Sequence, residues 1–99
     1  MAGFEWDPEK EALNIRKHGI DFTSASLIWD DDVLERIDTR RDYGEVRVQA
    51  FGAVESRILT VIFTWREDIR RIILARRANL REKRLFEAEI PKLGRPPAN

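Results

Sequence analysis

The sequence predicts an α+β fold: an antiparallel sheet of about four strands, plus a short N-terminal strand, packed against two N-terminal helices and followed by a C-terminal helix. Three observations lead to this prediction. Residues on one apolar face recur every three or four positions over residues 22–29, and apolar residues recur mainly every second position from residue 33 to residue 77. Short connections join the segments of period two, which favours an antiparallel meander. A helix-capping pattern then begins at Asn79.

The N-terminal third predicts one short strand and two helices. Residues 4–7, "FEWD", alternate between apolar and acidic, which is typical of a strand. Asp7 and Pro8 then favour a helix start, because the aspartate accepts free backbone N–H groups and proline presets the first helical φ. This helix should reach about Lys17 and end at Gly19. A second helix is expected over residues 21–30, with one apolar face formed by Phe22, Ala25, Ser26 and Trp29.

Four strands are predicted next, over residues 33–38, 46–51, 57–65 and 70–77. Side chains alternate between the faces of a strand, so one face of the third segment should pack under the helices. That face carries Leu59, Val61, Phe63 and Trp65. The opposite face of the sheet should gather a polar patch formed by Arg47, Gln49, Thr60, Thr64 and Arg66. The phase of residues 70–77 stays open, because Arg76 and Arg77 must point to opposite sides.

A capping box of Asn79 and Glu82 predicts the C-terminal helix, and Leu80, Leu85 or Phe86, and Ala88 or Ile90 should give it an apolar side. Pro91 should end it. Residues 91–99 are rich in proline and have few apolar anchors, so we expect a flexible tail.

Length and composition indicate one domain spanning residues 1–99. With 42% apolar and 36% charged residues, the chain is typical of a soluble globular protein. We expect it in the cytoplasm, without membrane association, because no apolar run reaches the roughly 18 residues of a spanning helix and the N-terminus is unlike a secretory signal. With no cysteine and one histidine, the sequence predicts neither a metal site nor a cofactor.

Charge is unevenly distributed although the formal net charge is zero. Residues 1–45 contain 12 acidic and 6 basic residues, a net charge of −6, whereas residues 46–99 contain 6 acidic and 12 basic residues, a net charge of +6. Such a division can produce a basic face that attracts phosphates or an acidic partner. It is also compatible with a solvated surface held by intramolecular ion pairs.

Residues 38–47, "DTRRDYGEVR", concentrate charge without contributing to a core. Arginine binds phosphate through paired donors and stays ionised. The arginines at or near strands, which we take as candidate phosphate ligands, are Arg40, Arg41, Arg47, Arg66, Arg76 and Arg77. RNA cleavage without a metal also needs a base for the ribose 2′-hydroxyl, and His18, Glu45 and Lys17 are the candidates.

Each of these side chains also has a structural interpretation. His18 could interact with the last carbonyls of its helix, and Glu45 could form a simple ion pair with Arg47. Tyr43 and Trp65 could stack on a splayed base, but Trp65 shares the parity of Phe63 and is expected in the core. We assign Trp6 and Trp29 to core packing.

Four segments in this order resemble the BrnT family of bacterial type II toxins: "FEWDPEKEALNIRKHGIDF", "DTRRDYGEVR", "TVIFTWRED" and "RRIILARRANLREKRLFE". Together they lie within residues 4–87. The resemblance implies a fold similar to the RelE-type ribonucleases, RNA cleavage that halts translation, and neutralisation by a BrnA-like antitoxin. That antitoxin would carry the DNA-binding segment, so contact with DNA would be indirect. The family pattern falls on Lys17, His18, Gly19, Phe22, Asp38, Tyr43, Gly44, Glu45, Arg47, Arg66, Arg76, Ala78 and Glu82.

The sequence departs from that pattern at three positions. Phe86 and Phe63 stand where the family commonly has tyrosine, and Leu74 stands where it commonly has serine. The polar groups that the resemblance would supply there are absent.

The resulting hypothesis is a metal-independent endoribonuclease toxin. Arg66 and Arg76 would stabilise the scissile phosphate with help from Arg47. Glu45, His18 or Lys17 would act as base. Tyr43 would orient the nucleotide, and Arg40 and Arg77 would contact RNA. The main alternative is a non-catalytic module that binds RNA or the antitoxin through the same basic sheet face. A third is a purely structural interaction domain.

Overall fold

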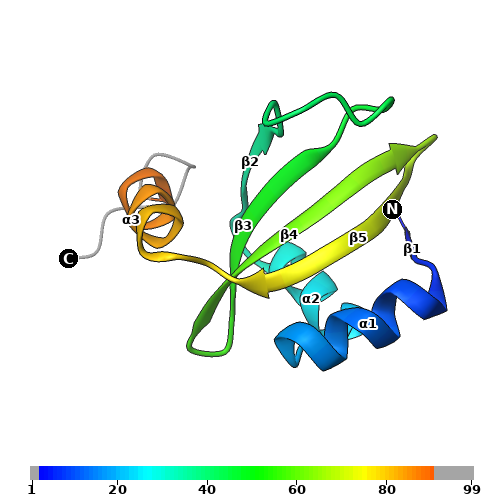
Figure 1. The fold of residues 1–99 in the computed structure, drawn as a ribbon. Coiled ribbons are helices and arrows are strands. Elements are labelled where there is room, and N and C mark those ends of the chain that lie inside the picture. The colour runs from blue at the N-terminus through cyan, green and yellow to red at the C-terminus, as the bar shows by residue number, and fades with distance from the viewer. Residues whose placement is uncertain (1–2, 91–99) are drawn as a thin grey trace.

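The computed structural model describes residues 3–90 and confirms the α+β fold (Figure 1). Within these residues, a five-stranded sheet has the order β1-β5-β4-β3-β2. The strands are β1 (Phe4–Glu5), β2 (Leu34–Ile37), β3 (Val48–Val54), β4 (Arg57–Arg66) and β5 (Ile69–Arg77). The helices are α1 (Pro8–His18), α2 (Phe22–Ser26), the 3₁₀ helix η1 (Leu27–Asp30) and α3 (Leu80–Glu89). The tail predicted for residues 91–99 lies outside the described residues.

Strands β2 to β5 form the predicted antiparallel meander, but β1 differs from the rest of the sheet. It runs parallel to β5, with Phe4 opposite Arg70 and Glu5 opposite Arg71. A tight hairpin imposes an antiparallel arrangement, whereas a long connection does not. Because α1, α2 and three strands separate β1 from β5, its direction was not fixed by the turns, and the sheet is mixed.

The predicted bounds of β3 were wrong at both ends. The strand begins at Val48 instead of Val46, and it continues to Val54 through the segment expected to be a loop. The turn that joins β3 to β4 consists of Glu55 and Ser56, and Glu55 has a φ of 57°. Gly52 lies inside the strand because η1 approaches closely there: a Cβ at this position would be 2.7 Å from the Cβ of Ile28.

Helix α1 begins and ends as predicted. The Asp7 carboxylate accepts a hydrogen bond from the Glu9 N–H at 2.9 Å, and Gly19 adopts φ 72° after the last turn. The second predicted helix, however, is broken into α2 and η1. The tighter 3₁₀ turn changes which side chains face inward. Ile28 is therefore fully buried, whereas Ser26 is only partly so.

The core lies between α2, η1 and one side of the sheet, which we call the first face. Leu59, Val61 and Phe63 are fully buried there, as predicted. Trp65 was expected beside them, but 44% of it is exposed, because it sits near the end of β4. The Arg70 guanidinium packs 4.5 Å from the centre of its ring. Trp6 and Trp29 pack against the core as predicted.

The opposite side of the sheet, which we call the second face, carries Thr60 and Thr64. A β-bulge in β5 determines which arginines of that strand lie on this face. Ile62 lies opposite Leu74 but Phe63 lies opposite Ile72, so Ile73 is the extra residue of β5. An extra residue reverses the alternation of side chains beyond it. As a result, Arg76 lies in the same row as Thr60, and Arg71 lies in the same row as Thr64.

Helix α3 lies on the other side of the sheet from α1 and α2 (Figure 1). Both hydrogen bonds of the predicted capping box between Asn79 and Glu82 are present. Phe86 is buried, but 61% of Leu80 is exposed, so the expected apolar side is only partly used. Across the described part of the chain, no helix has the length and apolarity needed to cross a membrane.

Candidate functional site

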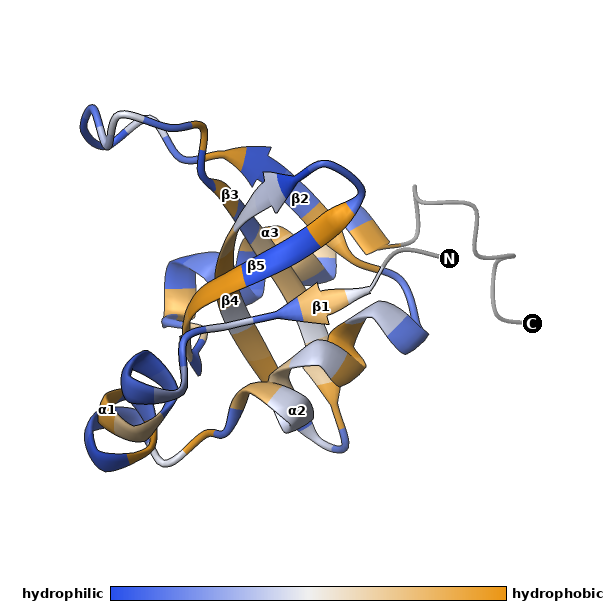
Figure 2. Ribbon diagram, turned by 90° about the vertical axis from the view of Figure 1, so that its right-hand side faces the viewer, coloured by the Kyte–Doolittle hydropathy of each residue, from blue (hydrophilic) through white to orange (hydrophobic). Residues whose placement is uncertain are grey.

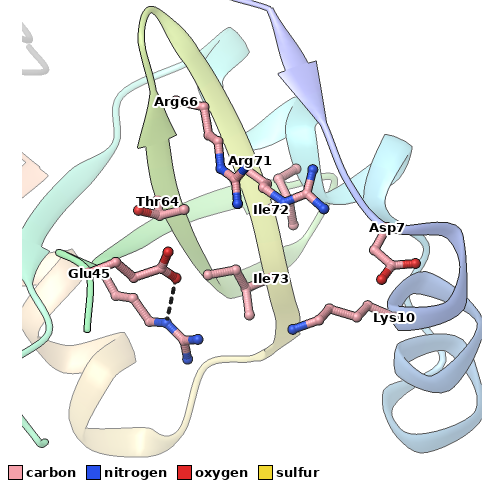
Figure 3. A pocket seen from close by; sticks show the side chains of 9 residues that line it. Asp7, Lys10, Glu45, Thr64, Arg66, Arg71, Ile72 and Ile73 are labelled. Atoms are coloured by element: carbon pink, nitrogen blue, oxygen red, sulfur yellow. Dashed lines mark hydrogen bonds and ion pairs between the residues drawn. The ribbon is translucent and has the colours of Figure 1, made fainter. Parts of the chain in front are cut away.

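A hollow of about 190 Å³ opens where β4, β5, α1 and the loop before β3 meet, and we call it the cationic hollow (Figure 3). It is lined by Asp7, Lys10, Glu45, Arg47, Thr64, Arg66, Arg71, Ile72 and Ile73. Figure 3 shows Arg66 and Arg71 together at one end, with Glu45 and Lys10 on opposite sides. Four cationic side chains thus face two carboxylates, and the local charge favours an anion.

The loop of residues 38–47 forms one wall of this hollow and extends from β2 and β3 as a largely hydrophilic segment (Figure 2). Asp38 anchors it. Its N–H donates to the Arg47 carbonyl at 2.8 Å, and its fully buried carboxylate accepts two bonds of 2.9 Å from Arg40 and one of 3.2 Å from the Tyr43 hydroxyl. Hydrogen bonds from Arg40 lower the pKa of Asp38 to about 2. Much of the charge in this stretch therefore holds the loop in shape.

Tyr43 places Arg47 at the hollow. The Arg47 guanidinium lies 4.1 Å from the centre of the Tyr43 ring, and Arg41 packs on the same ring at 5.3 Å. The Nε of Arg47 also donates to Glu45 at 3.3 Å. This pair is partly exposed and contributes little stability. Both groups remain accessible to a ligand.

Arg66 is the arginine of the hollow whose guanidinium has no partner in the described part of the chain. The residue is exposed, and its side chain makes no hydrogen bond or ion pair within residues 3–90. Arg71, by contrast, donates to Glu5 at 2.6 Å. Thr64, which lies opposite Arg71 in the sheet, donates its hydroxyl hydrogen to the Val46 carbonyl. A guanidinium without a partner at the end of a rigid strand can bind a phosphate without first breaking another bond.

Arg76 lies on the second face but is held by α3. Its guanidinium donates to both carboxylate oxygens of Glu82, at 2.7 and 2.8 Å. Burial opposes the charged form of Glu82, but hydrogen bonds from Arg76, the Asn79 backbone and Thr60 outweigh it and lower the pKa of Glu82 to about 2. This pairing leaves Arg76 fewer donors for a phosphate.

The polar patch predicted for the second face is therefore divided. Thr60 is buried against Glu82, and the Gln49 side chain accepts a bond from Arg36 at 2.8 Å. Only Arg47, Thr64 and Arg66 of the five predicted residues line the cationic hollow.

Lys17 and His18 line a second hollow, which we call the helix hollow because it runs along α1. Its residues are Lys10, Leu13, Asn14, Lys17, His18, Ile73 and Leu74. Burial, the charge of Lys17 and the charge of Arg76 lower the pKa of His18 below its usual 6.5. The imidazole is therefore mainly neutral at pH 7 and can accept a proton.

Asn14 lines the helix hollow and fixes α1 against β5. Its amide donates to the Ile20 and Ala75 carbonyls, both at 2.8 Å, and accepts from the Ala75 N–H at 3.1 Å. A buried amide with its bonding capacity so fully used is a rigid support. The position of α1 relative to β5 is thereby fixed.

The two remaining candidates lie elsewhere. Arg40 is paired with Asp38 at a separate hollow beside β2. Arg77 lies opposite Leu59, at the far end of β5 from Arg71. Sequence reasoning missed Lys10 and Arg71 as lining residues. The spacing of Lys10 and Lys17 on one side of α1 could have indicated the first, whereas Arg71 depends on the bulge.

No three or more carboxylate, imidazole or thiol side chains within residues 3–90 gather as metal ligands would. The described part of the site thus presents cations, two carboxylates and one imidazole.

Comparisons with known proteins bear on the fold and the family of this chain. The crystal structure of the Brucella abortus ribonuclease toxin BrnT is similar to this chain, with 28% sequence identity and a TM-score of 0.60. The match covers 80% of this chain and 99% of the Brucella chain. No curated protein matches the sequence. The family model described as ribonuclease toxin, BrnT, of type II toxin-antitoxin system matches residues 6–82. Because that match spans most of the chain, this protein belongs to the BrnT family of ribonuclease toxins.

Proposed function

We propose that this chain is an endoribonuclease that cleaves RNA without a metal ion and so inhibits translation. The observation that supports this most directly is Arg66, an exposed guanidinium without a partner among residues 3–90, in a hollow that also holds Glu45 and Arg47. A cationic site beside a potential base is what phosphodiester cleavage requires, because negative charge grows on the phosphate oxygens in the transition state.

In this mechanism the ribose 2′-oxygen attacks phosphorus while a base takes its proton. The bond from phosphorus to the 5′-oxygen breaks, and that oxygen takes up a proton, which leaves a 2′,3′-cyclic phosphate and a 5′-hydroxyl end. Arg66 and Arg47 stabilise the phosphate oxygens, and Tyr43 orients the nucleotide through its contact with Arg47. Arg76 contributes its charge near His18 while bound to Glu82.

The base is one of Glu45, His18 and Lys17. Glu45 lines the cationic hollow, whereas His18 and Lys17 line the helix hollow. Glu45 lies beside the phosphate-binding arginines. His18 has the favourable protonation state, because its lowered pKa keeps it neutral at pH 7. A general base works only in its deprotonated form.

If His18 is the base, kcat/KM for a short RNA should fall as the pH decreases through a value below 6.5, because the imidazole becomes protonated. His18→Gln should remove this acid limb and lower the rate by about a hundredfold or more. The measurement is the pH dependence of single-turnover cleavage for both proteins. An unchanged limb in His18→Gln would assign the base to another group, with Glu45→Gln as the next variant.

We further propose a BrnA-like DNA-binding antitoxin as partner, with action on cytoplasmic RNA. The family description places BrnT in type II toxin-antitoxin systems, in which the toxin has an antitoxin. Arg40 and Arg77 would contact only parts of an RNA that extend beyond the cationic hollow, because they lie away from it.

The test of this function is incubation of purified chain with single-stranded RNA in EDTA. We expect shorter RNA with 2′,3′-cyclic phosphate and 5′-hydroxyl ends, which mass spectrometry identifies. Full-length RNA that nevertheless binds the chain would favour the alternative of a non-catalytic binding module. The engagement of Arg76 by Glu82 is the feature that would then explain the missing activity.

A further inference from the structure

The cationic hollow and the helix hollow are parts of one groove. Lys10 and Ile73 line both of them. Strand β1 covers the edge of β5 at Arg70 and Arg71, so the groove runs between α1 and the rest of β5. The two parts differ in character. Charged groups dominate the first, whereas the second has an apolar floor of Leu13, Ile73 and Leu74 with Lys10, Lys17 and His18 around it.

Leu13 is the residue that core packing does not explain. It is 58% exposed in the middle of α1. Lys10, Leu13 and Lys17 are separated by three and four positions, so they lie on one side of the helix. Ile15 is the other large apolar residue of α1 that is exposed, at 45%, and it lines neither hollow. The exposed leucine is thus directed at the groove.

We propose that the helix hollow binds one nucleobase of the RNA, next to the phosphate held by Arg66 and Arg47. This inference rests on the proposed function. The helix hollow has a volume of about 300 Å³, which is large enough for a planar base. Single-stranded RNA is commonly held by bases that leave the stack and lie on side chains, while cations follow the backbone.

Two features favour a nucleobase over a peptide of the antitoxin. The apolar floor continues directly into the phosphate-binding end of the groove, as the base and phosphate of one nucleotide do. Lys10 and Lys17 lie on either side of Leu13 along α1, where they can accompany a backbone that carries one negative charge per nucleotide.

The base would be bound by shape and apolar contact. Asn14 lies in the hollow, but its bonds to Ile20 and Ala75 occupy its amide. The remaining polar side chains, Lys10, Lys17 and His18, surround the floor. We therefore expect a preference for base size over a strict sequence code.

The test uses Leu13→Ala, with Ile15→Ala as the matched control on the same helix. Both alanines favour the helix, so folding should be preserved. The probe is a short single-stranded 2′-O-methyl RNA, which lacks the attacking hydroxyl and stays intact. Leu13→Ala should weaken its binding about fivefold, the equivalent of about 1 kcal/mol for one lost base contact. Ile15→Ala should change it less than twofold.

A set of the same oligonucleotides, each lacking one base, locates the contact. At one position the abasic site should weaken binding to the unaltered chain, and Leu13→Ala should have no further effect there. The inference is overturned if Leu13→Ala binds every oligonucleotide as tightly as the unaltered chain does. It is also overturned if Leu13→Ala weakens binding by the same factor whichever base the oligonucleotide lacks. Loss of antitoxin binding with unchanged RNA binding would also overturn it, in favour of a peptide.

Arg66→Ala separates this inference from the proposed function. If Arg66→Ala weakens RNA binding and Leu13→Ala does not, the base site is wrong and the nuclease proposal stands. If the unaltered chain binds no RNA, both are wrong.

Discussion

Arg66→Ala should lower the rate of RNA cleavage by about a hundredfold or more. Loss of a single donor that stabilises developing oxyanion charge typically has an effect of this size. The side chain is exposed and makes no hydrogen bond or ion pair within residues 3–90, so its removal should not disturb β4. Single-turnover cleavage of a short RNA at saturating protein measures the chemical step.

Arg57→Ala provides the matched control, because Arg57 is at the opposite end of the same strand and lines a different hollow. It should retain nearly full activity. Thermal denaturation of both variants should match that of the unaltered chain. A decrease of less than threefold for a folded Arg66→Ala would exclude Arg66 from the mechanism.

Glu82→Gln should lower the free energy of unfolding by about 3 kcal/mol or more, since breaking a buried ion pair leaves an uncompensated charge. Glu82 is 5% exposed, and its carboxylate accepts hydrogen bonds from Arg76, Thr60 and the Asn79 N–H. The substitution removes the charge that attracts Arg76 and weakens the cap of α3. Urea denaturation at pH 7 measures the difference.

The pH dependence of this difference has a defined sign. The pKa of Glu82 is lowered to about 2 in the folded chain from its ordinary 4.5. Its contribution to stability is therefore complete above about pH 4.5 and is lost as the pH falls through about 2. The gap between Glu82→Gln and the unaltered chain should be constant from pH 7 to pH 5 and should narrow below that.

Glu87→Gln is the control on the same helix, because Glu87 is exposed. It should change stability by no more than about 0.5 kcal/mol at any pH. Equal stability of Glu82→Gln and Glu87→Gln would show that α3 is held by its apolar contacts alone.

Local chemistry made much of the fold predictable. The Asp7–Pro8 start of α1 and the Asn79–Glu82 capping box depend only on neighbouring residues, and both are present. The meander follows from short turns and alternating side chains. The break between α2 and η1 and the direction of β1 depend on packing between distant segments, which periodicity does not contain.

The candidate site was less predictable for a related reason. Glu45, Arg47 and Arg66 were found because their residue types and strand positions suit phosphate binding, and they line one hollow. Without the bulge, Arg70 would share a face with Arg76, whereas the extra Ile73 puts Arg71 there instead. The pairing of Arg76 with Glu82 depends on where α3 returns to the sheet.

Asn14 has a consequence for how the sheet can meet other chains. Its amide bonds both the N–H and the carbonyl of Ala75, the two groups that an incoming strand would have to pair with at this margin. Together with β1 at the other end of β5, this side chain blocks edge-to-edge addition there. Growth of the sheet into an aggregate, or augmentation by a partner's strand, is thereby directed to β2 at the opposite margin.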